Sequence, residues 1–215
     1  MTEGKGFWHV RKTSKEKVLE AAVELFYAKG YANTSVREIA SRATVNVALI
    51  SYHFNGKQGL LETLMTTFFD GYIGALEKEC EKVTNSTNSI RSHLESACRS
   101  MLLFQQQFDV LSRFVHREMT LDSILVREIM SSYLTKERHL FRYLLEEAFA
   151  QGEMITPVNE YMIIQLRGLL TLPFLHSQYI REVHYMVASE SYFLDRYFET
   201  VRKWLDAHIG EPSIV

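Results

Sequence analysis

Residues 35–54 read Ser35-Val-Arg-Glu38-Ile-Ala-Ser-Arg-Ala-Thr-Val-Asn-Val-Ala-Leu-Ile-Ser-Tyr-His-Phe, and this segment holds the most informative helix signals in the chain. Ser35 and Glu38 have the spacing of a capping box. In such a box the serine hydroxyl accepts a hydrogen bond from the glutamate N–H, and the glutamate side chain reaches back to the serine N–H. The box predicts a short helix over residues 36–43, with apolar side chains along one face.

A three-residue break at 44–46 follows this helix. Asn46 is a favourable N-cap, because its side chain can accept a hydrogen bond from the next turn, and it predicts a helix over residues 47–53. A longer helix precedes the capping box, since helical apolar spacing over residues 13–29 ends at a Lys-Gly pair. The sequence therefore predicts three helices in the order long, short, short.

This order is typical of a helix-turn-helix, in which the last helix enters the major groove of DNA. The apolar contact where the two short helices cross is predicted from Ile39, Ala40, Val45 and Ile50. Outward-facing candidates for contact with bases or sugar-phosphate are Asn46, Val47, Ala48, Leu49, Ser51 and Tyr52. Phosphate contacts need donors at helix N-termini and flanking cations. The candidates for these contacts are Thr34, Ser35, Arg37, His53 and Lys57.

The charge of the chain is unevenly distributed. All 215 residues carry a formal net charge of −2, from 24 basic and 26 acidic side chains. Residues 1–60 hold nine basic and five acidic groups, a balance of +4, which leaves −6 on the remainder. A basic segment on an acidic body favours a module that faces a polyanion, and binding to DNA should then weaken steeply with salt.

The remainder of the chain has helical apolar spacing almost throughout. Asn55-Gly56 predicts a turn before a helix that starts at Lys57, and the polar run 84–89 predicts a loop. Further helices are expected near residues 90–107 and 109–118, and from about 121 to 150. Another helix is expected from about Val158, directly after Pro157, and Pro173 should kink or end it. The last helix is expected from about 189 to 208.

The last of these helices is apolar around much of its circumference. One stripe consists of Leu194, Phe198, Val201, Leu205 and Ile209, and a second stripe consists of Phe193, Tyr197 and Trp204. Such a helix must be covered on more than one side. The second stripe is therefore a candidate dimer interface, and the alternative is a central helix buried within one monomer.

The head of the chain resembles the N-terminal domain of the TetR family of bacterial transcriptional regulators. The resemblance rests on the runs that begin at Tyr31, at Val45 and at Lys57, and it covers residues 13 to about 65 closely. It implies an all-α fold divided into a tail (1–12), a helix-turn-helix DNA-binding domain (13–57), a helical dimerisation and effector or partner domain (58–210) and a second tail (211–215).

The same resemblance implies a homodimeric repressor on a palindromic site in double-stranded DNA. It assigns phosphate contacts to Thr34, Ser35, Arg37, His53 and Lys57, base or backbone contacts to Asn46, Val47, Ala48, Leu49 and Tyr52, and a packing role to Phe54. Thr44 stands where the family usually has glycine, so a less extreme turn is expected. Ser51 replaces a usual tyrosine, which puts a contact at that position in doubt.

The body of the chain leaves two function classes open. Members of the family usually bind a small-molecule effector in a cavity of the helical domain. Five polar residues in otherwise apolar helices could line such a cavity or a partner surface, namely Arg113, His116, Arg117, Tyr133 and Arg167. The alternative is that these residues are exposed and form ion pairs. A narrower resemblance, to RefZ-type members of the family, implies instead a DNA-bound regulator of cell division that acts on the division protein FtsZ without an effector.

Other classes of protein lack support in the sequence. The eight histidines show no metal-ligand spacing, no glycine-rich phosphate loop occurs, and two cysteines are too few for a disulfide framework or a four-cysteine zinc site. We therefore expect no enzymatic activity, cofactor or metal. The N-terminus lacks the apolar core of a signal peptide and no segment is apolar for long enough to span a bilayer, which predicts a cytoplasmic, nucleoid-associated protein without a membrane partner.

Overall fold

The computed structural model describes residues 13–121, 123–154 and 156–209, and the predicted tails 1–12 and 211–215 lie outside them. The described residues form α-helices without a strand, which confirms the predicted all-α class. The helices are α1 (Ser14–Lys29), α2 (Val36–Ala43), α3 (Ala48–Phe54), α4 (Lys57–Val83), α5 (Ile90–Gln107), α6 (Asp109–Met119), α7 (Ile124–Ala150), α8 (Glu160–Leu175), α9 (Ser177–His184) and α10 (Ser191–His208).

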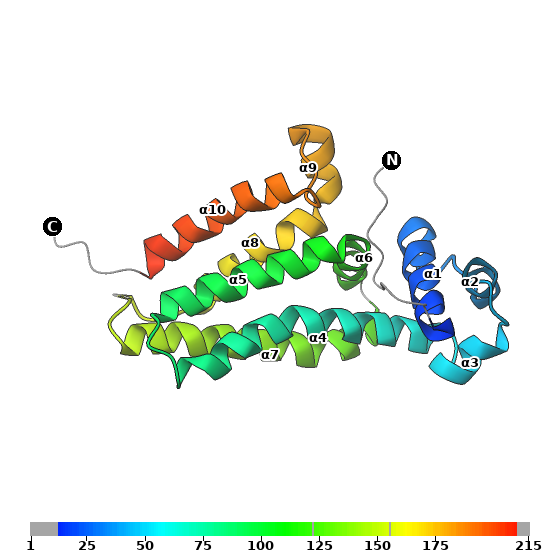
Figure 1. Cartoon of the computed structure of the whole chain (residues 1–215), viewed down its shortest axis with the longest axis horizontal. Helices are drawn as coiled ribbons and strands as arrows, with labels where there is room; N and C mark the ends of the chain where they lie inside the picture. The colour runs from blue at the N-terminus through cyan, green and yellow to red at the C-terminus, as the bar shows by residue number, and fades with distance from the viewer. Residues whose placement is uncertain (1–12, 122, 155, 210–215) are drawn as a thin grey trace. The chain divides into compact units, whose positions relative to one another are not determined.

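The chain folds as two compact units that are not contiguous in sequence. The first unit combines residues up to 68 with residues 107–129, and the second combines residues 69–106 with residues 130 onward. Figure 1 colours the chain along its length, so that α1, α2 and α3 appear in blue to cyan and α10 in red.

The first unit is built around α1. Thr13 and Glu16 form a capping box at its N-terminus, and Gly30, with a φ of 86°, ends the helix. Only glycine adopts such a conformation without strain, which explains the Lys-Gly signal in the sequence. The buried face of α1 includes Val18 and Phe26, and the Phe26 ring stacks on Phe114 of α6 with centroids 5.6 Å apart.

Helix α6 belongs to this first unit although it lies far from the other head helices in sequence. It packs against α1, and the Arg117 guanidinium donates hydrogen bonds to the carbonyl oxygens of Phe26 (2.7 Å) and Tyr27 (2.8 Å). Arg113 lies over the Tyr27 ring, 4.6 Å from its centroid. The predicted boundary at residue 57 therefore does not coincide with the compact units, because α6 supplies part of the surface that buries α1.

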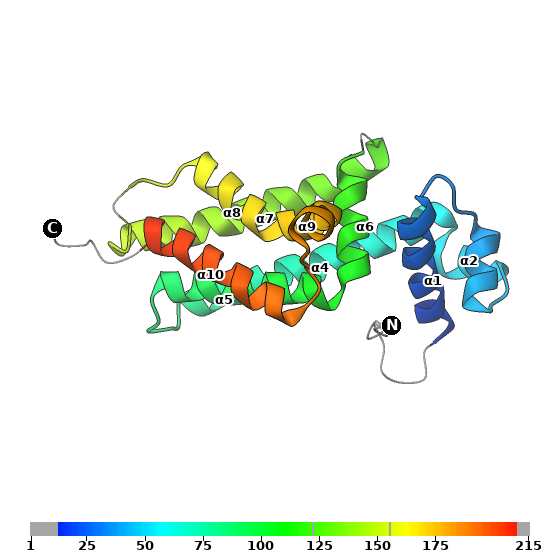
Figure 2. The same cartoon turned by 90° about the horizontal axis from the view of Figure 1, so that it is seen from above.

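In the second unit, the 69–83 part of α4, the 130–150 part of α7, and α5, α8 and α10 run roughly along one direction in both views (Figures 1 and 2). The core is apolar, with Phe141, Leu144, Phe174 and Val201 among its buried side chains. Helices α5 and α10 are also joined by ion pairs, including Arg91–Asp206 and, at 3.0 Å, Arg202–Glu95.

Several helix boundaries differ from the prediction. Helix α8 begins at Glu160 rather than near residue 158, because the Asn159 side chain caps it by accepting a hydrogen bond from the Met162 N–H. Pro173 lies within α8, two residues before its end, and α9 is a separate helix that the sequence pattern does not predict. Helix α7 starts at Ile124 instead of about 121, and α10 starts at Ser191 instead of about 189.

Candidate nucleic-acid interface

Helix α3 has one buried face and one exposed face. Ile50 and Phe54 are buried, which confirms the predicted packing role of Phe54. Tyr52 is 82% exposed and Val47, directly before the helix, is 40% exposed. Ala48, Ser51 and His53 are also exposed and Leu49 is half-buried. The predicted base-facing residues are therefore brought together on the solvent side of one short helix.

The turn before α3 is tighter than predicted. Thr44 has φ 55° and ψ 49°, so it adopts the left-handed conformation usual for glycine, and the expectation of a less extreme turn is wrong. The Thr44 N–H still closes α2 by bonding the Ser41 carbonyl oxygen at 3.2 Å. A β-branched residue in this conformation is strained, by about 1–2 kcal/mol.

Helix α3 begins at Ala48 with Val47 as its N-cap, so the predicted cap at Asn46 lies one residue too early. The Asn46 Oδ1 atom accepts a hydrogen bond of 2.9 Å from the Ala48 N–H. The exposed side chain of Asn46 is therefore held at the start of α3.

The N-terminus of α2 carries Ser35 and Arg37, both exposed. The predicted capping box is present: the Ser35 Oγ atom accepts from the Glu38 N–H at 3.2 Å, and Glu38 accepts from the Ser35 N–H at 2.8 Å. Hydrogen bonds from Lys29 and then from Ser35 lower the pKa of Glu38 to about 2. Arg37 forms no ion pair or hydrogen bond with any other residue that the structure describes, and its guanidinium is therefore available to a phosphate.

Thr34 has a structural role that its position in the sequence does not reveal. Its side chain is only 2% exposed, and its hydroxyl donates to the carbonyl oxygens of Gly30 (2.9 Å) and Leu25 (3.3 Å). These contacts tie the α1–α2 connection to the end of α1. The predicted phosphate contact through the Thr34 side chain is therefore corrected, because its hydroxyl is buried against backbone.

Lys57 likewise binds the protein's own backbone. Its Nζ atom donates to the carbonyl oxygens of Tyr31 (2.8 Å), Ala32 (3.3 Å) and Thr34 (2.9 Å), and it lies 4.5 Å from the centroid of the Tyr31 ring. An ammonium group has three N–H donors, so all three are used. Lys57 thus holds the α1–α2 connection in place, and its predicted phosphate contact is corrected accordingly.

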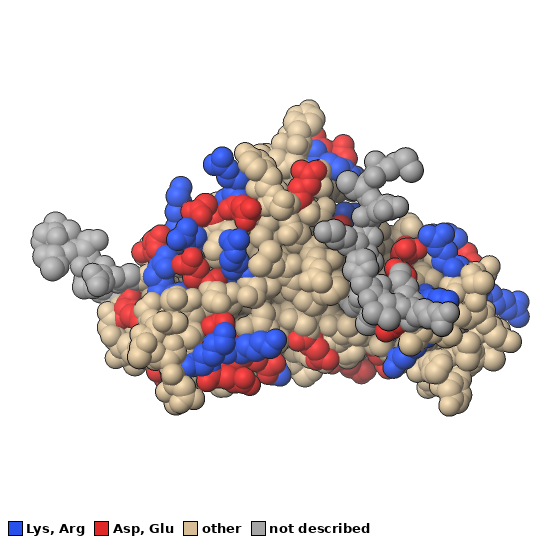
Figure 3. Space-filling view, viewed as in Figure 1, with Lys and Arg blue, Asp and Glu red and all other residues tan. Residues whose placement is uncertain are grey.

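Other basic groups near α2 and α3 are partly neutralised. Lys29 pairs with Glu38 and Arg42 pairs with Glu24, at 2.7 and 2.8 Å. On the second unit, Figure 3 shows basic and acidic side chains interspersed over the viewed face. The basic excess counted over residues 1–60 includes Lys5, Arg11 and Lys12, which lie outside the described residues.

The candidate dimer residues of α10 are half-buried, and two of them, Tyr197 and Trp204, contact α8. The Tyr197 hydroxyl donates to the Leu169 carbonyl oxygen at 2.7 Å, and the Trp204 indole N–H donates to Gln165 at 3.3 Å. Phe193 stacks on Tyr197. Beside them α8 exposes large apolar side chains, namely Tyr161, Ile164, Leu172 and Leu175.

The five candidate effector or partner residues divide between the two units and are all engaged internally. In the first unit, Arg113 pairs with Asp109 at 3.2 Å, the buried His116 ring packs edge-on to Phe68, and Arg117 binds the end of α1 as described above. In the second unit, the Tyr133 hydroxyl donates to Asp70 at 3.0 Å, and Arg167 pairs with Glu137 at 3.0 Å.

Glu137 is a buried carboxylate that sequence reasoning missed. It is 1% exposed, although its polar neighbours, Thr135, Lys136 and Arg138, are typical of a solvated face. Burial raises the pKa of Glu137, and the charge and hydrogen bond of Arg167 oppose this shift. The helical spacing of Glu137 from Phe141 and Leu144 is the signal that could have placed it on the buried face of α7.

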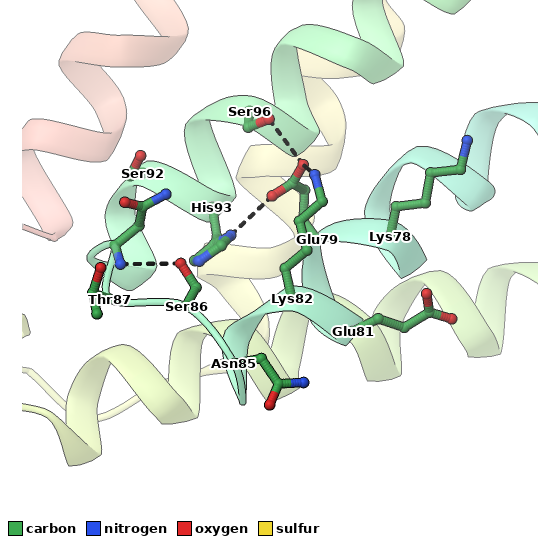
Figure 4. Close-up of a pocket in the computed structure, with 11 residues that line it drawn as sticks. Lys78, Glu79, Glu81, Lys82, Asn85, Ser86, Thr87, Ser92, His93 and Ser96 are labelled. Carbon is green, nitrogen blue, oxygen red and sulfur yellow. Dashed lines mark hydrogen bonds and ion pairs between the residues drawn. The ribbon is translucent and has the colours of Figure 1, made fainter.

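A surface pocket of about 710 Å³ lies in the second unit between the end of α4, the loop after it and the start of α5. Figure 4 shows Glu79 at its centre, bonded to His93 (2.9 Å) and Ser96 (3.0 Å). Burial alone would raise the pKa of Glu79, but hydrogen bonds from Lys82, His93 and Ser96 outweigh it and lower the pKa. The lining is polar, and all of it comes from residues 78–96, away in sequence from the five candidate effector residues.

Comparison with known proteins agrees with a helix-turn-helix in the N-terminal part of the chain. Residues 18–64 match the family described as bacterial regulatory proteins, tetR family. The chain is 45% identical over 196 residues to the probable HTH-type transcriptional regulator YttP of Bacillus subtilis (strain 168), covering 91% of this chain and 94% of YttP. Over 101 residues it is 26% identical to the biofilm operon icaADBC HTH-type negative transcriptional regulator IcaR of Staphylococcus aureus (strain Newman), which covers 47% of this chain and 50% of IcaR.

The fold is similar to that of solved structures. The TetR family transcriptional regulator PfmR from Thermus thermophilus superposes with a TM-score of 0.68 at 18% identity, covering 86% of this chain and 97% of PfmR. Within the described part of the chain, no helix has the length and apolar character needed to cross a membrane.

Proposed function

We propose that this chain, which belongs to the tetR family of bacterial regulatory proteins, is a transcriptional repressor that binds a palindromic DNA site as a homodimer. Family membership makes it a transcriptional regulator with a DNA-binding head. The palindromic site, the homodimer and the direction of regulation are our proposals, as is its action in the cytoplasm on the nucleoid. Repression is supported by the relative IcaR, which is described as a negative regulator.

The observation that carries the proposal is the exposed face of α3. In a helix-turn-helix the second helix of the pair lies in the major groove, with its N-terminal residues at base edges. Val47, Ala48, Ser51 and Tyr52 form such a face here, while Ile50 and Phe54 anchor the helix from behind. We propose that Asn46, Val47, Ala48, Leu49, Ser51 and Tyr52 face the bases or the adjoining sugar-phosphate.

Phosphate contacts in the proposal fall to Ser35, Arg37 and His53, all of which are exposed. Phosphate contacts position a protein on DNA without reading sequence, and removing one of them reduces the dependence of affinity on salt. Thr34 and Lys57 shape this surface from inside, since both bond to the backbone of the α1–α2 connection.

For the homodimer we propose a surface formed by α8 and α10. Ile164 and Tyr161 are 64% and 76% exposed on α8, and Phe193, Tyr197 and Trp204 are half-buried on α10. A monomer rarely exposes so many large apolar side chains on neighbouring helices. Ile164→Glu should therefore yield monomers in analytical ultracentrifugation, whereas Ile124→Glu, at an equally exposed position in the first unit, should leave the dimer intact; dimers in both variants would contradict this surface.

The body could couple DNA binding to an effector or to a protein partner. For an effector, a small molecule would favour a dimer whose heads are wrongly spaced for DNA. Arg113, His116, Arg117, Tyr133 and Arg167 stay candidates for this coupling, although each would exchange an internal contact for the ligand. The RefZ-like role with FtsZ stays a prediction that rests on sequence resemblance alone.

Genome-wide mapping of bound sites tests the proposal directly. The full chain is cross-linked to DNA in cells, and a Tyr52→Ala variant serves as the reading-deficient comparison beside a Tyr179→Ala control, which alters an exposed tyrosine on α9. Palindromic sites at one or a few promoters, absent in Tyr52→Ala only, would support a repressor. Sites dispersed along the chromosome would favour the positional role, and no enrichment over input would contradict sequence-specific binding.

A further inference from the structure

We infer that the recognition helix reads its site chiefly through thymine methyl groups, so that each half-site carries thymines at the positions that face the start of α3. The inference rests on the proposed DNA-binding function and deepens it, because it names the chemical feature that distinguishes the correct sequence. It follows from which side chains α3 exposes and from how Asn46 is already used.

The exposed side chains nearest the N-terminus of α3 are aliphatic. Val47 is 40% exposed and Ala48 is exposed directly after it. These residues occupy the end of the recognition helix that reaches base edges in helix-turn-helix proteins. In the major groove the apolar feature available to them is the C5-methyl group of thymine, which small aliphatic side chains contact in direct readout.

The other common modes of base reading lack a suitable side chain. Bidentate recognition of guanine requires arginine or lysine, and residues 46–53 contain neither. Bidentate recognition of adenine requires both the oxygen and the nitrogen of an Asn or Gln amide. The single amide side chain in this stretch belongs to Asn46, and the hydrogen bond of 2.9 Å from the Ala48 N–H to its Oδ1 atom holds the amide at the start of α3 and leaves one of the two oxygen lone pairs for a base.

The remaining exposed side chains of α3 include a further apolar contact surface. Tyr52 is 82% exposed and lies one helical turn beyond Ala48, so its ring is available to pack on a further methyl group or on sugar. Ser51 and the tyrosine hydroxyl can donate to or accept from either base pair, so they discriminate weakly. The thymine methyl is therefore the feature that this helix is best equipped to recognise.

The size of the effect follows from the area that one methyl group buries. Removing one methyl contact should weaken binding about fourfold, and removing the same methyl in both halves of a palindrome should weaken it about fifteenfold. Deoxyuridine makes this change, because it pairs as thymine does and lacks only the C5-methyl group.

The experiment begins by selecting bound DNA from a random-sequence pool with the full chain. Thymines of the enriched site are then replaced singly by deoxyuridine, and guanines by 7-deazaguanine, which lacks the N7 acceptor. We expect one or two deoxyuridine positions per half-site to weaken binding about fourfold each, and the 7-deazaguanine positions to change it less than about twofold. An enriched site that responds to 7-deazaguanine and not to deoxyuridine overturns the inference while leaving the proposed function standing. Failure to enrich any sequence overturns the proposed function as well.

A pair of variants assigns the contact to α3. In Val47→Ala, deoxyuridine at the thymine that Val47 contacts should cost less than about twofold, because the two changes remove the same contact and are not additive. Ile124→Ala removes a more exposed aliphatic group outside the recognition helix and should retain the full fourfold penalty, about that of the unaltered chain. The experiment is repeated with Ala48→Ser. If deoxyuridine costs the same at every thymine in Val47→Ala, Ala48→Ser and Ile124→Ala, the assignment of the contact to the start of α3 is overturned.

Discussion

Replacing Lys57 by methionine separates the two roles that this residue could have. Methionine keeps an unbranched apolar side chain of similar length and removes the ammonium group. In the structure that group donates to three carbonyl oxygens, at 2.8, 3.3 and 2.9 Å, and lies over the Tyr31 ring. We expect Lys57→Met to destabilise the head while leaving the number of phosphate contacts unchanged.

The magnitude follows from the interactions that the ammonium group makes. The carbonyls of Tyr31 and Thr34 are partly buried, and removing a charged donor from each costs about 1 kcal/mol, below the fully buried range because water can reach them in part. The carbonyl of Ala32 is exposed and water replaces its donor. The cation–π contact adds about 0.5–1 kcal/mol. The total decrease in the free energy of unfolding is therefore about 2.5–3 kcal/mol.

The assay combines two measurements on the full chain at one fixed protein concentration. Urea unfolding followed by circular dichroism reports the decrease in stability, and hydrogen exchange of residues 31–36 locates it in the α1–α2 connection. Titration of DNA at several salt concentrations gives the slope of log affinity against log salt, which changes by about 0.9 for each phosphate contact that is removed.

Arg37→Met is the matched control, because Arg37 is exposed and forms no ion pair or hydrogen bond with any other described residue. We expect it to reduce the salt slope by about 0.9 per head and to change the free energy of unfolding by less than about 0.5 kcal/mol. The opposite pattern, with a reduced slope and unchanged stability in Lys57→Met, would refute the structural role of Lys57 and restore its phosphate contact.

Three further predictions concern the geometry of the protein. Thr44→Gly should raise the free energy of unfolding by about 0.5–1 kcal/mol. The substitution relieves the strain of the left-handed conformation, and the greater entropy of glycine in the unfolded chain offsets part of this gain. Equal or lower stability in urea would contradict this account. Gly59→Ala should lower the free energy of unfolding by at least about 2 kcal/mol, because the new Cβ would lie 1.7 Å from the Phe54 carbonyl oxygen. Gly74→Ala, also in α4 but with open space around it, should raise the free energy of unfolding by about 0.5–1 kcal/mol. Similar urea midpoints for the two variants would refute the clash. Glu38→Gln should reduce the loss of stability on acidification from about pH 4.5 toward 2. A carboxylate with a lowered pKa stabilises the fold above its unfolded pKa and ceases to do so as it is protonated. Urea midpoints across this pH range check the prediction, and an unchanged pH dependence would count against the Lys29 and Ser35 contacts.

Local signals in the sequence predict the helices of the head well. The capping box at Ser35 and Glu38, the glycine at position 30 and the hydrogen bond from the Ala48 N–H to Asn46 each act within one helical turn, so the residues that cause the structure are adjacent in sequence. The same locality limits the prediction. The pattern around Pro173 indicates a kink or a helix end, but it does not separate α9 from α8 directly before it.

The roles of individual polar residues required the folded structure. Thr34 and Lys57 are polar residues at helix ends, which is where phosphate contacts are expected, but both bond to backbone oxygens that the α1–α2 connection and the end of α1 present to them. Glu137 lies among polar neighbours in sequence and is nevertheless buried, and it pairs with Arg167 of α8, which lies 30 positions away in the chain.

Capping and apolar periodicity are properties of neighbouring residues, so the all-helical class, the helix-turn-helix and the exposed face of α3 follow from the sequence. The folded chain was needed to show that α6 joins the DNA-binding head and that Lys57 and Thr34 stabilise this head from within. These outcomes depend on groups far apart in the chain: Arg117 reaches the carbonyls of α1 across some ninety positions, and Lys57 reaches back across more than twenty. The direction of a polar side chain is set by whichever unsatisfied backbone group the fold places within its reach, and no local pattern records that.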